Sequence, residues 1–248
     1  MPPPEQIQLE RGSVVSTFAV AAAYVSSIND LASTFTTDST EILSAIELHS
    51  AFIQHCVEFG SPESALAVYD AFCQIYGTTA SNIHVVVQTR ALDESAARRV
   101  LKGYFSAWSI VNRRGDSSPF RSATPTPALF AAESTGLMAM FGGQLGAGNY
   151  LDEAAWLLDV YRPLLLDFVS HMSTFLHHES QDRRIVRAYP RGFDVLCWLT
   201  TPDAIPSEAY LLSSPICMPL FGLIQLMHVM VLYKTLGVSA GDLVKRFK

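Results

Sequence analysis

The amino-acid sequence predicts an α/β protein in which a large all-helical N-terminal region precedes an incomplete α/β unit. Apolar residues recur at three- and four-residue spacing from Ser13 to about Asn112, which is the helical period. The later run GLMAMF (136–141) is apolar on both faces, as in a buried parallel strand. A glycine-rich turn, Gly142–Gln144, then leads into a second helical pattern. We therefore expect a helical region over 1–113, a linker over 114–135 and the start of an α/β unit over 136–248.

Capping residues mark the helix boundaries of the first region. Ser61, followed by Pro62 and Glu63, has the composition of a helix start, and Asp93 is a second expected N-cap. Two glycines, Gly60 and Gly77, are expected to end helices. These signals predict helices over about 14–35, 39–60, 61–77 and 93–114, the second starting near Asp38, Ser39 and Glu41. Residues 83–90 are ambiguous.

The second half begins with a linker and continues as helices. Residues 114–135 are rich in Ser, Thr and Pro, which predicts a long loop, and the Arg-Gly-Asp inside it is a chance occurrence. Residues 149–178 follow a helical pattern with a break or kink at Pro163, and 194–203 run from a helix into a turn. A short apolar segment ending at Pro215 and Pro219 then precedes a helix that Gly237 is expected to end.

Residues 219–237 form the most apolar segment of the chain. Gln225 and His228 lie in its middle and Lys234 near its end. The segment falls slightly short of the ~20 apolar residues that a membrane span requires. We therefore expect a buried core helix and no membrane partner.

The composition indicates a well-packed protein or a part of a larger assembly, with 49% hydrophobic and 16% charged residues and a mean hydropathy of +0.23. A net charge of -6 without a basic stripe argues against nucleic acid as the main partner. The N-terminal MPPPEQIQLERGS lacks the basic start and apolar run of a secretory signal. Without CxxC spacing, the cysteines are expected to be reduced core thiols of a cytoplasmic protein: Cys56, Cys73, Cys197 and Cys217.

Several features between Leu129 and Leu243 occur in an order that resembles one protein family. They are the Phe-Gly-Gly-Gln turn at 141–144, a helix, a Leu-x-Trp-Leu at 196–199, the segment YLLSSPICMPL, an Ile-Gln-Leu helix and the closing LGVSAGDL. This ordered set resembles the N-terminal part of the β subunit of fungal fatty acid synthase, where its acetyltransferase domain begins. The preceding helical region is compatible with the same subunit.

The resemblance implies a role for the glycine-rich turn. In that family, the Gln of a Gly-Gln-Gly turn lies beside the nucleophilic serine and shapes the oxyanion and acyl pocket. Gln144 matches this position, and Gly142 and Gly143 let the backbone approach closely because they have no Cβ. Leu145 replaces the usual third glycine, and its side chain would narrow the pocket.

The nucleophile of that family lies on a Gly-His-Ser-x-Gly elbow, and the family's catalytic His lies further downstream. We expect this chain to hold no Gly-x-Ser-x-Gly segment at all. We therefore expect the chain to be the N-terminal part of such a subunit, or a truncated copy, and to be inactive alone. The implied activity is acyl or acetyl transfer from CoA to acyl carrier protein in fatty acid or starter-unit biosynthesis. The resemblance also implies acyl-CoA as the substrate class, no bound cofactor, and acyl carrier protein and other synthase subunits or domains as partners.

Two alternatives remain open. The chain could be a noncatalytic docking or regulatory module that binds a synthase through apolar surface around 136–141 and 220–236. It could also be a starter-unit transacylase region of a polyketide synthase, a family that usually has an acidic residue where this chain has Gly143.

We expect no other chemistry from the histidines and carboxylates. His177 and His178 are adjacent, so they point in different directions from a helix and do not form the i, i+4 pair of helical metal sites. His228 is expected to be a satisfied core residue, and Asp152 and Glu153 to open a helix. No metal site, phosphate loop or dinucleotide-binding fingerprint is expected.

Overall fold

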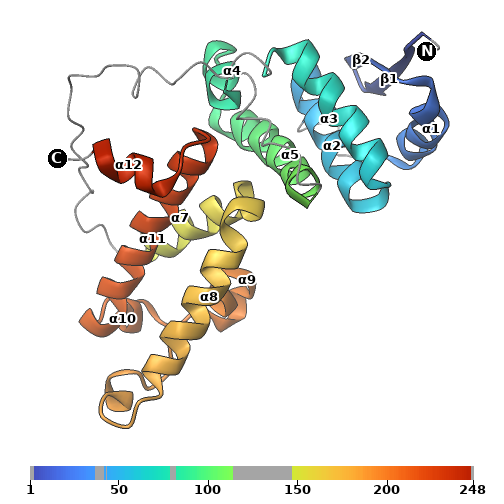
Figure 1. Cartoon of the computed structure of the whole chain (residues 1–248). Helices are drawn as coiled ribbons and strands as arrows, with labels where there is room; N and C mark the ends of the chain where they lie inside the picture. The colour runs from blue at the N-terminus through green and yellow to red at the C-terminus, as the bar shows by residue number, and fades with distance from the viewer. Residues whose placement is uncertain (1–2, 37–41, 43, 79–81, 114–146, 247–248) are drawn as a thin grey trace. The chain divides into compact units, whose positions relative to one another are not determined.

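The computed structural model describes residues 3–36, 42, 44–78, 82–113 and 147–246. The chain divides into two compact units, Met1–Ala131 and Ala132–Lys248, and each is described by itself. Helices dominate both units, and the described strands form one two-stranded sheet (Figure 1). The predicted linker, the predicted strand at 136–141 and the Gly142–Gln144 turn lie outside the described residues.

The first unit begins with an antiparallel hairpin of β1 (Glu5–Arg11) and β2 (Val14–Val20). Arg11 pairs with Val14, so the turn is two residues long, and Gly12 supplies the positive φ of 58° that this tight turn needs. One face is buried and the other faces solvent. The buried residues are Ile7, Leu9, Ser16, Phe18 and Val20.

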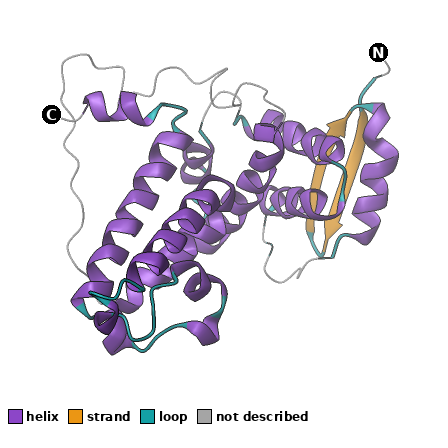
Figure 2. Ribbon diagram, turned by 60° about the horizontal axis from the view of Figure 1, so that its bottom comes forward, coloured by secondary structure: helices purple, strands orange, loops and turns teal. Residues whose placement is uncertain are grey.

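This hairpin corrects the expectation of an all-helical first region. We expected a helix from residue 14, but the sequence VVSTFAV forms a strand, and helix α1 begins only at Val25. The segment contains β-branched residues and alternates buried with exposed positions, which suits a half-buried strand next to a partner. Figure 2 shows α1 next to β1, with α2 and α3 packed against β2.

The helices predicted over 61–77 and 93–114 lie close to their predicted positions. Residues 83–89, which were ambiguous, form a short helix. The bounds are α1 (Val25–Thr34), after a 3-10 turn at Ala22–Tyr24, then α2 (Ala45–Phe59), α3 (Pro62–Tyr76), α4 (Ile83–Thr89) and α5 (Glu94–Arg113).

Most of the predicted caps are confirmed by their geometry. Ser61 Oγ accepts the Ser64 N–H at 3.2 Å, and Asp93 Oδ1 accepts the Ala96 N–H at 2.8 Å. Gly77 ends α3 in the left-handed conformation with a φ of 76°. The start of α2 was predicted too early: Asp38, Ser39 and Glu41 lie outside the described residues, and α2 begins at Ala45.

Two small residues let α2 and α5 approach closely. Ser50 on α2 donates a hydrogen bond from Oγ to the Val100 carbonyl of α5 at 2.8 Å. One turn further along α5, a Cβ added to Gly103 would overlap the Ser50 carbonyl oxygen. This contact brings the two backbones together at the centre of the first unit.

The described part of the second unit is helical. The predicted break near Pro163 is confirmed, because α7 ends at Val160 and Pro163 lies in the first turn of α8, where no N–H is needed. The helices are α7 (Ala147–Val160), α8 (Arg162–Ser180), α9 (Val195–Thr200), α10 (Glu208–Leu211), α11 (Ser214–Thr235) and α12 (Ala240–Arg246), with 3-10 turns at Val186–Ala188 and Pro202–Ala204.

Helix α11 starts earlier than predicted, so Pro219 lies inside it. Pro219 has no N–H for the Pro215 carbonyl one turn back, and Tyr189 Oη donates to that carbonyl at 3.4 Å instead. Gly237, with a φ of 66°, follows the end of the helix as predicted.

Only one face of α11 is buried, which corrects the expectation of a core helix. Leu220, Ile224 and Met227 are fully covered, whereas Met218 and Leu226 are 54% and 49% exposed. By length and composition α11 is apolar enough to cross a membrane, a property that core helices of soluble proteins share. The α/β unit expected here rests on residues 136–141 and stays a prediction.

Candidate functional site

The predicted oxyanion turn of Gly142, Gly143 and Gln144 lies outside the described residues, so its role stays a prediction. Within the described residues, four features could carry chemistry. They are a Gly-x-Ser-x-Gly segment, a groove in the first unit, the buried thiols and the histidines.

Residues 237–241 read Gly-Val-Ser-Ala-Gly, so the expectation that the chain holds no Gly-x-Ser-x-Gly segment was wrong. The structure gives these residues a capping role. The Val238 N–H donates to the Tyr233 carbonyl at 3.1 Å across Gly237, and Ser239 directly precedes α12. A nucleophile elbow needs a strand before the serine and a strained backbone, whereas Ser239 follows a helix and has no positive φ.

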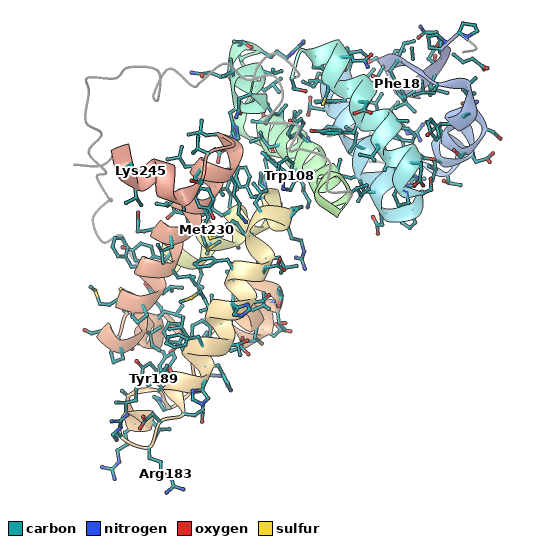
Figure 3. All side chains as sticks on the ribbon, in the orientation of Figure 1. Phe18, Trp108, Arg183, Tyr189, Met230 and Lys245 are labelled. Carbon is teal, nitrogen blue, oxygen red and sulfur yellow. The ribbon has the colours of Figure 1, made fainter. Side chains whose placement is uncertain are left out.

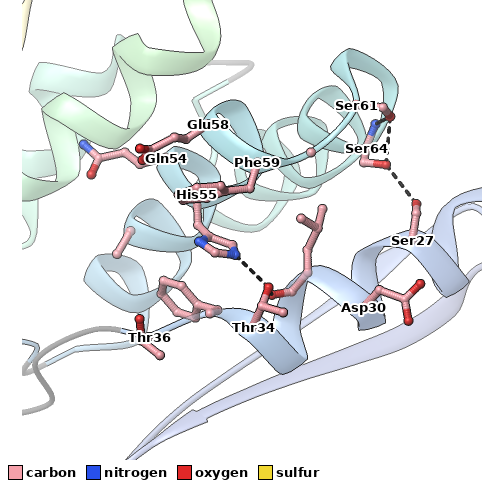
Figure 4. Close-up of a pocket in the computed structure, with 14 residues that line it drawn as sticks. Ser27, Asp30, Thr34, Thr36, Gln54, His55, Glu58, Phe59, Ser61 and Ser64 are labelled. Atoms are coloured by element: carbon pink, nitrogen blue, oxygen red, sulfur yellow. Dashed lines mark hydrogen bonds between the residues drawn. The ribbon is translucent and has the colours of Figure 1, made fainter.

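A groove of about 810 Å³ lies between α1, the end of α2 and the start of α3 (Figure 4). Polar and apolar side chains both line it, and its carboxylates are Asp30 and Glu58. The Phe59 side chain is 65% exposed beside it. The Ser27 and Ser64 hydroxyls hydrogen-bond to each other at 2.9 Å, which joins α1 to α3. These groups can bind a polar or cationic ligand.

The groove also brings a hydroxyl next to an imidazole, which is the arrangement of a nucleophile with its base. His55 Nε2 lies 3.2 Å from Thr34 Oγ1 (Figure 4). The Thr34 hydroxyl, however, donates its proton to the Leu31 carbonyl at 3.0 Å. With the threonine proton directed at the Leu31 carbonyl, Thr34 Oγ1 accepts from His55 Nε2, which is the reverse of the arrangement in which a base removes the threonine proton.

Three of the four predicted core thiols are buried, whereas Cys197 is not in the core. Cys56, Cys73 and Cys217 are buried and Cys197 is half-buried, and all four are free. Burial raises the pKa of Cys56 to about 12 and that of Cys73 to about 11. Little thiolate therefore forms near neutral pH at these two residues.

Two histidines of the first unit are held neutral by burial. Desolvation lowers the pKa of His49 and that of His84 to about 4. His49 is fully covered, stacks on Phe18 with 4.4 Å between the ring centroids, and its Nε2 lies 3.2 Å from the Val68 carbonyl. A neutral ring that donates to a carbonyl in the core is a structural group.

His228 and Glu153 form a hydrogen-bonded pair that sequence reasoning did not predict. His228 Nε2 on α11 lies 2.7 Å from Glu153 Oε1 on α7, and the side chains are 43% and 38% exposed. The His228 ring therefore has a hydrogen-bond partner, as expected, but the residue is not in the core. Glu153 lies in the second turn of α7, so the expectation that it opens a helix was wrong. The pair joins two helices that are far apart in the sequence.

His177 and His178 are exposed in the last turn of α8. Across the described ranges, no group of three or more His, Cys, Asp or Glu side chains could hold a metal ion.

Comparison with known protein-family models gives no match. The chain is 33% identical to the fatty acid synthase subunit beta of Schizosaccharomyces pombe over 167 residues, which is 67% of this chain and 8% of that protein. It is 29% identical to the fatty acid synthase subunit beta of Gibberella zeae over 236 residues, 94% of this chain and 10% of that protein. The corresponding subunit of Saccharomyces cerevisiae is 34% identical over 152 residues, 59% of this chain and 7% of that protein.

These similarities support the fungal fatty acid synthase β-subunit family that the ordered sequence features resemble. The matched relatives are named as subunits of a fatty acid synthase. The chain spans only 8% and 10% of the length of the first two relatives.

Proposed function

We propose that this chain is part of a fungal-type fatty acid synthase β subunit and serves acyl transfer from CoA to acyl carrier protein. The observation that carries the proposal is the 33% identity to a curated β subunit over 167 residues. The ordered features between Leu129 and Leu243 support a position at the start of the acetyltransferase domain. Acyl carrier protein and other synthase subunits or domains are the proposed partners, acyl-CoA is the proposed substrate class, and the cytoplasm is the proposed location.

In this proposal Gln144 contributes to the acyl pocket. Acyl transfer passes through a tetrahedral intermediate, and positioned N–H donors stabilise its oxyanion more strongly than they stabilise the thioester. A glutamine amide between Gly143 and Leu145 can supply such a donor, and the glycine gives the substrate access to the backbone.

A chimera tests this role. The matching segment of the S. pombe subunit is replaced by the segment of this chain, and acetyl transfer from acetyl-CoA to acyl carrier protein is measured. We expect the chimera to transfer the acetyl group. The Gln144→Ala substitution should lower the rate of transfer by about 10²–10³-fold, which is the usual effect of removing one oxyanion donor. Gln74→Ala, on an exposed position of α3, is the matched control and should leave the rate unchanged. Equal rates for the chimera and its Gln144→Ala variant would rule out the assigned role.

The proposal also requires the 248 residues to be inactive alone, because they contain no Gly-His-Ser-x-Gly. Incubation with labelled acetyl-CoA, followed by denaturation and mass spectrometry, should find no acylated residue. Since Ser239 lies in the Gly-x-Ser-x-Gly segment, a Ser239→Ala variant is measured in parallel. Stable acylation that disappears in this variant would show that Ser239 is a nucleophile despite its helical surroundings.

A further inference from the structure

A nine-residue segment of the second unit concentrates positive charge. Residues 183–191, here named the arginine arm, contain Arg183, Arg184, Arg187 and Arg191 but no Asp or Glu. The whole chain has 17 Lys and Arg residues and a net charge of -6, so this local excess runs against the overall balance.

The positive charge of the arm is exposed and largely uncompensated. All four arginines are exposed, and Figure 3 shows Arg183 pointing away from the helices of its unit. Asp182, just before the arm, pairs with Arg184 through Nη2 and Oδ2 at 2.6 Å. Arg183, Arg187 and Arg191 have no carboxylate partner within the described residues.

Main-chain hydrogen bonds hold the arm in one conformation. The Val186 N–H donates to the Asp182 carbonyl at 2.8 Å, and the Ala188 N–H donates to the Ile185 carbonyl at 2.8 Å. A 3-10 turn at Val186–Ala188 results. The arm is therefore ordered before any partner binds, which reduces the entropy lost on binding.

Aromatic residues attach the arm to the second unit. Tyr189 stacks on the buried Phe193 with 6.2 Å between ring centroids, and Phe193 stacks on Trp198 at 5.3 Å. Just past the arm, Tyr210 Oη donates to the Gly192 carbonyl at 2.6 Å. The arginines thus project from a base that is fixed by the core.

Two apolar side chains lie exposed between the arginines. Ile185 and Val186 are 41% and 37% exposed. An arm that served only to keep the protein soluble would not need apolar side chains among its charges. Arginines around a small apolar centre have the composition of a protein–protein contact, in which apolar burial supplies affinity and charge supplies orientation.

We infer that the arginine arm binds an acidic surface of a partner protein, with carboxylates facing Arg183, Arg187 and Arg191 and an apolar side chain against Ile185 and Val186. A guanidinium group presents a planar fork that matches a carboxylate. The net charge of -6 repels an extended polyanion such as a nucleic acid, because such a ligand would also lie near the acidic remainder of the chain. A compact acidic patch on a protein would contact the arginine arm alone. The inference is independent of the acyl pocket.

Fluorescence anisotropy of the whole chain with a labelled peptide, Glu-Glu-Leu-Glu-Glu-Leu-Glu-Glu, tests the inference. We expect saturable binding that weakens as salt rises, and weaker binding of a peptide in which every Glu is replaced by Gln. The triple variant Arg183→Gln, Arg187→Gln, Arg191→Gln should bind the peptide about tenfold or more weakly. Each exposed arginine–carboxylate pair contributes modestly, and the variant removes three of them. Ile185→Ser with Val186→Ser should weaken binding at all salt concentrations.

The control variant removes the same charge elsewhere, through Arg98→Gln, Lys102→Gln and Lys245→Gln, which are exposed positions outside the arm. It should keep most of the affinity, and circular dichroism checks that both triple variants are folded. Equal losses in the two triple variants would overturn the inference, since binding would then follow net charge alone. Tighter, arm-dependent binding of single-stranded DNA or of phosphatidylserine vesicles would also overturn it and assign the arm to those ligands.

Discussion

Arg99 Nη2 lies 2.6 Å from Glu47 Oε1, and the two residues join α5 to α2 across 52 positions of the sequence. The Arg99 Nε also donates to the same oxygen at 3.0 Å, and the Ser44 hydroxyl donates to Glu47 Oε2 at 2.7 Å. The Glu47 side chain is 1% exposed, so its charge depends on these donors for stabilisation. The pair thereby fixes the start of α2 relative to α5.

Arg99→Met is expected to lower the free energy of unfolding by about 2–3 kcal/mol, because it leaves the Glu47 carboxylate buried without its charged partner. Urea unfolding followed by circular dichroism measures the change. Arg162→Met, at an exposed position at the start of α8, should change stability by less than about 0.5 kcal/mol. Similar losses in both variants would mean that the pair contributes nothing specific.

Gly103→Ala is expected to destabilise the first unit by about 3 kcal/mol or more. The added methyl group would overlap the Ser50 carbonyl oxygen and push α2 away from α5. Gly222→Ala on α11 is a control of the same chemistry, since its Cβ would meet nothing within 4 Å. In that control the free energy of unfolding should rise by about 0.5–1 kcal/mol, because Ala has a better helix propensity than Gly. Thermal unfolding distinguishes the two, and a loss in both variants would contradict the close-packing explanation.

Stability should fall in acid because of His49, whose pKa burial lowers from 6.5 to about 4. As the pH falls below 6.5, His49 binds a proton in the unfolded chain but not in the folded chain, which favours unfolding. The contribution of His49 to the free energy of unfolding is therefore complete above pH 6.5 and is lost as the pH falls toward 4. Linkage gives a loss of about 3 kcal/mol over this window. His84, with a pKa also lowered to about 4, adds to the effect in the same direction.

Urea titrations at pH 7 and pH 5 measure this dependence. His49→Gln keeps a donor for the Val68 carbonyl but does not titrate, so its stability should fall less between the two pH values. His178→Gln removes an exposed histidine and should keep the wild-type dependence. Parallel pH dependences of wild type and His49→Gln would show that His49 is not responsible.

Thiol labelling should distinguish Cys197 from the other three cysteines. Cys197 is half-buried, whereas Cys56, Cys73 and Cys217 are buried. With iodoacetamide at pH 8, mass spectrometry should find Cys197 modified first in the folded protein and all four modified in urea. Early modification of Cys56 or Cys73 would contradict the raised pKa values of their thiols.

Local signals in the sequence predicted helix boundaries well where one residue decides the geometry. Ser61, Asp93 and Gly77 were predicted as caps, and each makes the expected contact or adopts the expected backbone conformation. A side-chain oxygen or a missing Cβ acts within one turn, so its effect does not depend on the rest of the fold.

Features that depend on distant residues were missed. VVSTFAV became a strand because β1 pairs with it and α2 and α3 cover its buried face, which no local pattern reveals. The His228–Glu153 bond joins residues that are 75 positions apart. The Gly-x-Ser-x-Gly segment at 237–241 is visible in the sequence and was overlooked, whereas its capping role depends on the flanking helices.

The two-residue connection at Gly12 and Ser13 limits how the N-terminal hairpin can vary. Successive side chains of a strand point to opposite faces, so one inserted residue that shifted the pairing would turn Phe18 and Val20 toward water and deprive His49 of its stacked ring. Two inserted residues would restore the original faces. Natural length changes here should therefore occur in even numbers, or be absorbed as a bulge that leaves Phe18 inside.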